Sequence, residues 1–312
     1  MKGQRCRVSI VFAIATMLLA VDFGSNAAGQ TRDGRETKTI SLGIVSEIDQ
    51  KEIEEHFRDF IRYVAQKLSS APDIAGRVVI APTLLDLVKL LEQKKVDFYM
   101  ESPYPTYRIN NVHGAAKLLL RRWKGGKDEY QSLIFTKRDG GIKRLEDLRG
   151  KVIVFEDPES TSGHFLPKFF LLRKGFKLAE KTRLEASVSP SEVGYVFAQS
   201  QAKLVDLVLT KQAAAGAFSD DDYATLEQKR RSDIAVLAHT EKLPRHLLSI
   251  RKDLPAGLAT RLQEILVLMH ESDEGRTILQ RADSTTKFDM LPGGEEGVRR
   301  RLLETFYSLE KK

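Results

Sequence analysis

A cluster of small hydroxyl residues, Ser160, Thr161 and Ser162, is followed by Gly163 and stands between an apolar run and a helical pattern. The apolar run, residues 152–155, contains β-branched residues and is typical of a buried strand. After the cluster, aromatic and aliphatic residues recur at helical spacing. Because the first turn of a helix has unpaired N–H groups and partial positive charge, this order predicts a site for a phosphate-like, sulfonate-like or carboxylate group.

Two interpretations of this turn remain open from the residues alone. The hydroxyl groups would add donors to an anion site, and Gly163 would let an oxyanion approach the backbone closely. Serine and threonine are also the ordinary N-caps of helices, so the turn could simply cap itself. His164 follows directly, either as an anion contact or as an exposed histidine of the first helical turn.

The segments before this turn predict a parallel sheet. Strand, helix, strand, helix and strand patterns follow one another at residues 39–45, 53–68, 77–81, 84–91 and 96–100. Ligands of such sheets bind beyond the carboxyl ends of the strands. Three places fit this rule, namely Ser46, residues 101–104 and residues 160–163.

A family resemblance is carried by residues 146–167, EDLRGKVIVFEDPESTSGHFLP. This stretch resembles the signature of the phosphonate/phosphite/phosphate-type periplasmic substrate-binding proteins of ABC importers, which are type 2 periplasmic binding proteins. In that family the Ser-Thr-Ser-Gly turn grips the oxyanion. The resemblance implies an α/β fold of two lobes, each a mainly parallel sheet flanked by helices, with two crossover strands as the hinge.

The same resemblance suggests the extent of the lobes. The first lobe would combine residues 39–118 with a return strand and C-terminal part at residues 241–312, and residues 119–240 would form the hinge strands and the second lobe. We expect the two lobes to close on the ligand and the closed form to dock on a membrane permease.

Further contacts follow from the resemblance, each beside a structural alternative. Ser102 and Tyr104, in VDFYMESPYPTY, would face the cleft from the first lobe, although Tyr104 could instead pack against its neighbouring prolines. Tyr130 is a further contact or a half-buried strand residue. Asp220 would meet an amine of the ligand, or the acids at 220–222 would only start a helix.

Two residues depart from the expected pattern. Glu101 stands beside the predicted cleft, where it would repel a phosphonate unless it faces away or meets a cationic group. Ala214 stands where the family resemblance suggests an acid. The ligand could therefore be a phosphonate, phosphite, phosphate, sulfonate or another small molecule.

The N-terminal segment, residues 1–27, is predicted to be a cleavable signal peptide that directs the protein to the periplasm. It has a basic start, an apolar run at residues 8–21 and the small residues Ser25 and Ala27 at the cleavage positions. An uncleaved anchor is the alternative. Cys6, the sole cysteine, lies in this segment, so the mature protein would have no disulfide and no thiolate metal site.

Composition and motifs argue against several other functions. The formal net charge is +7, but the basic residues are scattered among acids without an arginine stripe, which argues against nucleic acid binding. The six histidines show no close metal-ligand spacing, and nucleophile-elbow and phosphate-loop motifs are absent. We therefore expect a monomeric, non-enzymatic binding protein without catalytic residues, metal or cofactor. A periplasmic sensor that signals to a membrane receptor and a phosphate-ester hydrolase are the alternatives.

Overall fold

The computed structural model describes residues 38–46, 50–69 and 74–310. The predicted signal peptide, residues 1–27, lies outside the described residues. Within them, no helix has the length and apolar character needed to cross a membrane.

The first of two six-stranded sheets has the strand order β14-β4-β13-β3-β1-β2. Strands β1, β2 and β3 run parallel because helices connect them, whereas β13, β4 and β14 pair antiparallel. The strands are β1 (Lys38–Val45), β2 (Ile74–Ala81), β3 (Phe98–Glu101), β4 (Ala116–Lys124), β13 (His246–Arg251) and β14 (Thr285–Met290). This sheet and the helices on its faces are called the first lobe.

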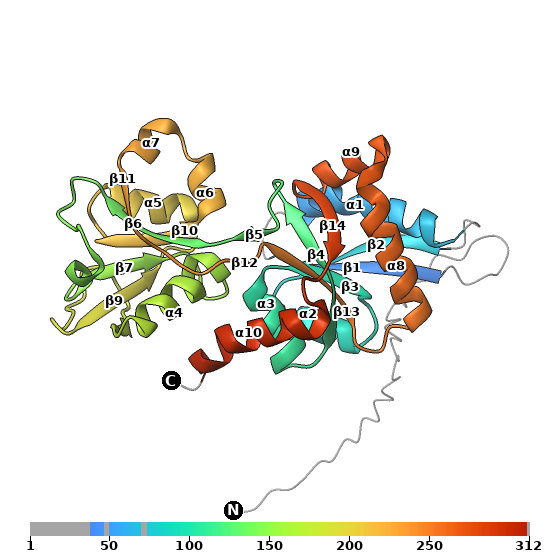
Figure 1. Ribbon diagram of the computed structural model, residues 1–312, viewed down its shortest axis with the longest axis horizontal. Coiled ribbons are helices and arrows are strands. Elements are labelled where there is room, and N and C mark those ends of the chain that lie inside the picture. The colour runs from blue at the N-terminus through green and yellow to red at the C-terminus, as the bar shows by residue number, and fades with distance from the viewer. Residues whose placement is uncertain (1–37, 47–49, 70–73, 311–312) are drawn as a thin grey trace, which may run out of the picture. The chain divides into compact units, whose positions relative to one another are not determined.

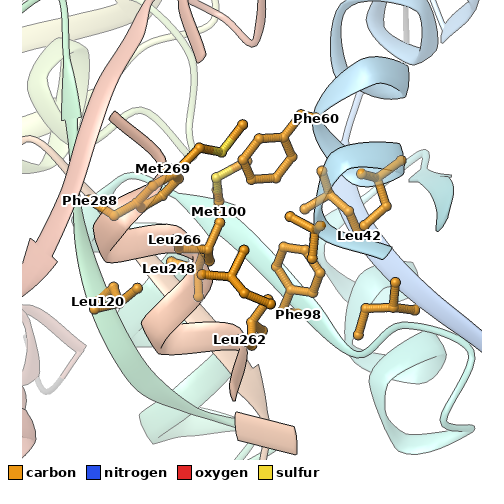
Figure 2. Packing of buried hydrophobic residues seen from close by; sticks show 14 of the residues in the cluster. Leu42, Phe60, Phe98, Met100, Leu120, Leu248, Leu262, Leu266, Met269 and Phe288 are labelled. Carbon is orange, nitrogen blue, oxygen red and sulfur yellow. The ribbon is translucent and has the colours of Figure 1, made fainter. Parts of the chain in front are cut away.

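Helices cover both faces of the first sheet (Figure 1). On one face, α1, α8 and α9 bury an apolar cluster in which Phe60 and Leu262 of the helices meet Leu42, Phe98 and Phe288 of the strands (Figure 2). On the other face, α2 packs with its own cluster around Leu87. The helices are α1 (Gln50–Leu68), α2 (Leu84–Glu92), α8 (Ala256–Leu268), η4 (Met269–Glu271) and α9 (Asp273–Arg281).

The second sheet has the strand order β11-β6-β10-β7-β9-β8 and forms the second lobe. Strands β10, β7, β9 and β8 run parallel, and β6 and β11 join antiparallel. Its strands are β6 (Ser132–Lys137), β7 (Val152–Phe155), β8 (Lys177–Glu180), β9 (Glu192–Phe197), β10 (Ala215–Ser219) and β11 (Ile234–His239). Its helices are η2 (Leu145–Leu148), η3 (Thr161–Phe165), α4 (Leu166–Arg173), α5 (Gln201–Leu209), α6 (Asp220–Thr225) and α7 (Gln228–Ser232).

Two short strands connect the lobes. β5 (Glu129–Tyr130) and β12 (Leu243–Pro244) pair antiparallel as a separate ladder between the two sheets (Figure 1). The C-terminal helix α10 (Gly294–Glu310) contacts both connecting segments. Its Arg301 donates to the Glu129 carboxylate at 2.9 Å and to the carbonyl oxygen of Lys242, the residue before β12. The C-terminal helix thus anchors the connecting strands to the first lobe.

The predicted two-lobed α/β fold is confirmed, with one difference in strand direction. Both sheets are mixed: β13 and β14 run against the other four strands of the first sheet, and β6 runs against the other five strands of the second. The sequence reasoning also missed β8 and β14. In β14 (TTKFDM) polar residues alternate with few apolar ones, and Asp289 faces Arg121 of β4 rather than a hydrophobic core.

Candidate functional site

The Ser160–Gly163 turn connects β7 to a continuous helical segment that starts as η3 and continues as α4. Ser160 is the N-cap, and its Oγ accepts the N–H of Gly163 at 2.9 Å and donates to Glu156 Oε2 at 2.9 Å. The local capping that the residues predicted is therefore present. It satisfies one amide of the first turn, while the N–H groups of Thr161 and Ser162 have no carbonyl partner inside the helix.

The first turn is a wide π-turn rather than a regular α-turn. Phe165 N–H reaches back to the carbonyl of Ser160, five residues earlier. Pro167 has no N–H to donate to the Gly163 carbonyl, which instead accepts the N–H of Glu156 at 3.1 Å. Single π-turns inside helices are frequent at functional sites.

Thr161 lies at a contact between the two lobes. Its hydroxyl lies 2.9 Å from Ser102 Oγ and accepts the backbone N–H of Tyr104 at 2.9 Å. Ser102 is the N-cap of α3 (Pro103–Tyr107), which continues as η1 (Arg108–Val112), so Tyr104 N–H belongs to a first helical turn as well. The structure therefore brings the predicted residues Ser102, Tyr104 and Thr161 into direct contact, with Thr161 only 2% exposed.

The Tyr104 ring packs against aromatic residues rather than against its neighbouring prolines, and its ligand contact stays a prediction. It stacks on Phe165 of the second lobe, with ring centroids 3.3 Å apart, and meets Phe306 of α10 edge-on. Arg108 donates to the Tyr104 hydroxyl at 3.2 Å and forms an ion pair with Glu159 across the lobes at 4.0 Å. Tyr104 thus offers its backbone N–H at the turn, and its side chain closes an aromatic contact between the lobes.

Tyr130 contributes a buried hydroxyl group beside the same turn. The residue is 1% exposed, and its hydroxyl has no hydrogen-bond partner within the described residues. Burial raises the pKa of Tyr130 above its usual range, and the Arg245 guanidinium and the Thr161 and Ser162 hydroxyls oppose this shift. A buried donor without an acceptor costs free energy, so it fits a place where a ligand oxygen would accept.

The Ser162 backbone and the His164 side chain contact the interior of the second lobe. The Ser162 carbonyl accepts the hydroxyl of Ser132 at 2.6 Å, which fixes the turn to β6. His164 is 4% exposed, not an exposed first-turn residue, and packs against the rings of Phe155 and Phe197 with Nδ1 3.1 Å from the Pro158 carbonyl. Burial lowers the pKa of His164 to about 4, so the ring is neutral at pH 7.

The acidic end of β10 starts helix α6, as one of the two interpretations held. Ser219 and Asp222 form a capping box there, and Asp220 Oδ1 accepts the N–H of Gln131 at 3.3 Å. It is the next residue, Asp221, that reaches the residues flanking the connecting strands, where its carboxylate lies 2.5 Å from both Arg245 Nε and Lys127 Nζ. The Asp220 ligand contact stays a prediction.

Ser46 and Glu101 lie at the carboxyl ends of β1 and β3. Ser46 N–H donates to the Ala81 carbonyl at the end of β2, and its role in ligand binding stays a prediction. The Glu101 carboxyl group lies beside the backbone of the site, where its Oε2 accepts the N–H of Ser102 at 3.2 Å. Burial raises the pKa of the Glu101 carboxyl to about 7.

Sequence reasoning missed the charged groups that surround the site. Arg108, Arg245 and Asp221 come from separate parts of the chain, and Arg108 reaches Glu159, and Asp221 reaches Arg245, through tertiary contacts. A signal was present for Asp221, which shares an acidic run with Asp220. Among the described residues, no group of three His, Cys, Asp or Glu side chains could hold a metal ion.

Comparison with known proteins identifies the family of this chain. Residues 42–291 match the family model described as the phosphonate periplasmic substrate-binding protein of an ABC transporter. The phosphate-import protein PhnD of Mycolicibacterium smegmatis is 24% identical over 193 residues, which are 60% of this chain and 59% of that relative. The match thus spans less than two thirds of the relative's length.

Two solved structures share the fold. A protein of Xanthomonas citri bound to ATP has 23% identity and a TM-score of 0.78, covering 88% of this chain and 98% of its own. PhnD1 of Prochlorococcus marinus in complex with methylphosphonate has 15% identity and a TM-score of 0.65, covering 88% and 100%. Because the family model covers most of the chain, the protein belongs to the periplasmic phosphonate-binding family, the non-enzymatic substrate-binding proteins of ABC transporters.

Proposed function

We propose that this protein binds a small phosphorus oxyanion, a phosphonate, phosphite or phosphate, between its two lobes and presents it to an ABC permease. The contact of Thr161 with Ser102 and Tyr104 carries this proposal, because it joins hydroxyl groups and first-turn amides of both lobes at one point. Donors of this kind favour an oxyanion over a neutral ligand.

In this proposal the oxyanion accepts hydrogen bonds from the first-turn amides of Thr161 and Ser162 and from the Tyr130 hydroxyl. The Ser102 and Thr161 hydroxyls then turn from each other to the ligand. Ligand binding stabilises the closed lobes only through contacts that the open form lacks, and the bonds from Ser102 and Tyr104 are of that kind. The ion pair of Arg108 with Glu159 would add to closure from the edge of the same contact.

Replacing Ser160 and Thr161 together with alanine is expected to weaken oxyanion binding at least about tenfold, or about 1.4 kcal/mol. The double variant loses the cap of Gly163 N–H and the hydroxyl that meets both Ser102 and Tyr104. Calorimetry with inorganic phosphate, phosphite, methylphosphonate, methanesulfonate and ATP would measure the affinities. ATP belongs in the panel because the Xanthomonas relative was solved with it.

Ser200→Ala provides the matched control, since Ser200 caps α5 of the same lobe in the same way and accepts the N–H of Lys203. The control should bind the probes as the unmodified protein does. Unchanged affinity of the double variant would remove the turn from the site, and binding of methanesulfonate alone would replace the phosphorus oxyanion with a sulfonate.

A further inference from the structure

A carboxyl group lies directly behind the proposed anion site. Glu101, the last residue of β3, accepts the N–H of Ser102 with Oε2 at 3.2 Å, and the hydroxyl of that same serine lies 2.9 Å from Thr161 Oγ1. One residue therefore separates the carboxyl group from the proposed ligand contacts. A negative charge there opposes the binding of an anion.

Nearby cations do not cancel this charge through direct contact. Arg122 and Lys124 of β4 both pair with Asp283, at 3.1 and 2.7 Å, and Arg245 pairs with Asp221. Within the described part of the chain, no cation forms an ion pair with Glu101. Among the described residues, the one hydrogen-bond partner of the Glu101 carboxyl group is the backbone N–H of Ser102.

The charge states of the surrounding groups single out Glu101. Burial raises its pKa to about 7, against the Ser102 N–H and the charges of Arg122 and Lys124, which lower it. His246 of β13 faces the same cluster, and burial together with Arg122, Arg245 and Lys124 keeps its pKa well below 6.5, so it is neutral. The pKa of Asp283 is lowered by Arg122 and Lys124 although burial opposes this, so it stays ionised.

We propose that Glu101 couples oxyanion binding at the Thr161 turn to the uptake of a proton, so that the anion is held with the Glu101 carboxyl group neutral. This rests on the proposed function. An anion beside Ser102 disfavours the carboxylate and favours its protonated form. By linkage, the affinity then falls as the pH rises through about 7, by at most about tenfold per pH unit for a single proton.

Glu101 would also make the site selective for the charge of the anion. At neutral pH the Glu101 carboxyl group is partly ionised. An anion of higher charge therefore either shifts Glu101 to its protonated form or binds more weakly. Protonation removes this penalty while the acceptor for Ser102 N–H remains, because the second carboxyl oxygen can carry the proton. Glutamine at position 101 imitates this neutral form and keeps the acceptor.

The test compares the unmodified protein with Glu101→Gln and with Glu92→Gln, an exposed glutamate at the end of α2 of the same lobe. Inorganic phosphate and methylphosphonate are titrated by calorimetry at about pH 6 and about pH 8, in buffers of different ionisation enthalpy, which gives the protons taken up on binding. Protonation of the probe itself is common to all the proteins and cancels in the comparison.

We expect the unmodified protein and Glu92→Gln to take up several tenths of a proton more than Glu101→Gln near pH 7 to 8. We also expect Glu101→Gln to bind at least about threefold more tightly at pH 8 than the unmodified protein and equally tightly at pH 6. Equal proton uptake in all three proteins, with binding intact, would overturn the proposed role of Glu101 and leave the proposed function standing. If neither probe bound to any of them, the proposed function itself would fail.

Discussion

Gly163→Ala is expected to reduce oxyanion binding by about a hundredfold or more, equivalent to about 2.7 kcal/mol. A Cβ at this position would lie 2.6 Å from Glu156 Cβ and 2.8 Å from Ser160 Oγ. Contacts this short force the turn to move, because Glu156 Cβ is fixed to β7 and Ser160 already holds the Gly163 N–H. The amides of the first turn would then no longer point to a common place.

Gly257→Ala in α8 is the matched control, since a Cβ there meets no atom within 4 Å. Calorimetry with methylphosphonate and inorganic phosphate measures both variants, and circular dichroism checks that they are folded. If folded Gly163→Ala kept the affinity of the unmodified protein, close approach of the ligand to this turn would be wrong.

Arg122→Ala is expected to lower the free energy of unfolding by about 3 to 5 kcal/mol. Arg122 is 1% exposed, and its guanidinium donates to Thr285 Oγ1 at 2.7 Å, to the Ala282 and Asp283 carbonyls and to the Asp283 carboxylate. Alanine leaves these buried acceptors without their donor and leaves a cavity between β4 and the turn before β14.

Urea unfolding of Arg122→Ala, Arg122→Lys and Arg299→Ala measures this effect. Lysine keeps the charge but not the planar fork, so its midpoint should lie between those of the alanine variant and the unmodified protein. Arg299 is an exposed residue of α10 paired with Glu296, and its removal should leave the midpoint unchanged. Equal midpoints for Arg122→Ala and Arg299→Ala would contradict the structural role of Arg122.

The elements that carry the site could be predicted from sequence because their signals are local. The apolar run of β7, the hydroxyl cluster and the apolar spacing that follows mark a strand, a cap and a helix within a short stretch. The resemblance of the same residues to a known family then supplied the two-lobed fold, which the matched family model and the solved structures support.

The remaining features depend on contacts between distant residues. No local pattern distinguishes Asp221, which meets Arg245, from Asp220, which bonds Gln131. The strand β14 has a weak apolar pattern because Asp289 pairs with Arg121 of β4. The environment of Glu101 likewise depends on a cluster from β4, β13 and the turn before β14, which no spacing in the sequence reveals.

The most direct test of the central claim is a crystal structure of the protein grown with methylphosphonate. We predict that the phosphonate oxygens accept hydrogen bonds from the Thr161 and Ser162 N–H groups and from the Tyr130 hydroxyl, with Ser102 contacting the same ligand from the first lobe. A phosphonate bound elsewhere on the protein, with Thr161 still bonded to Ser102 and Tyr104, would contradict the account.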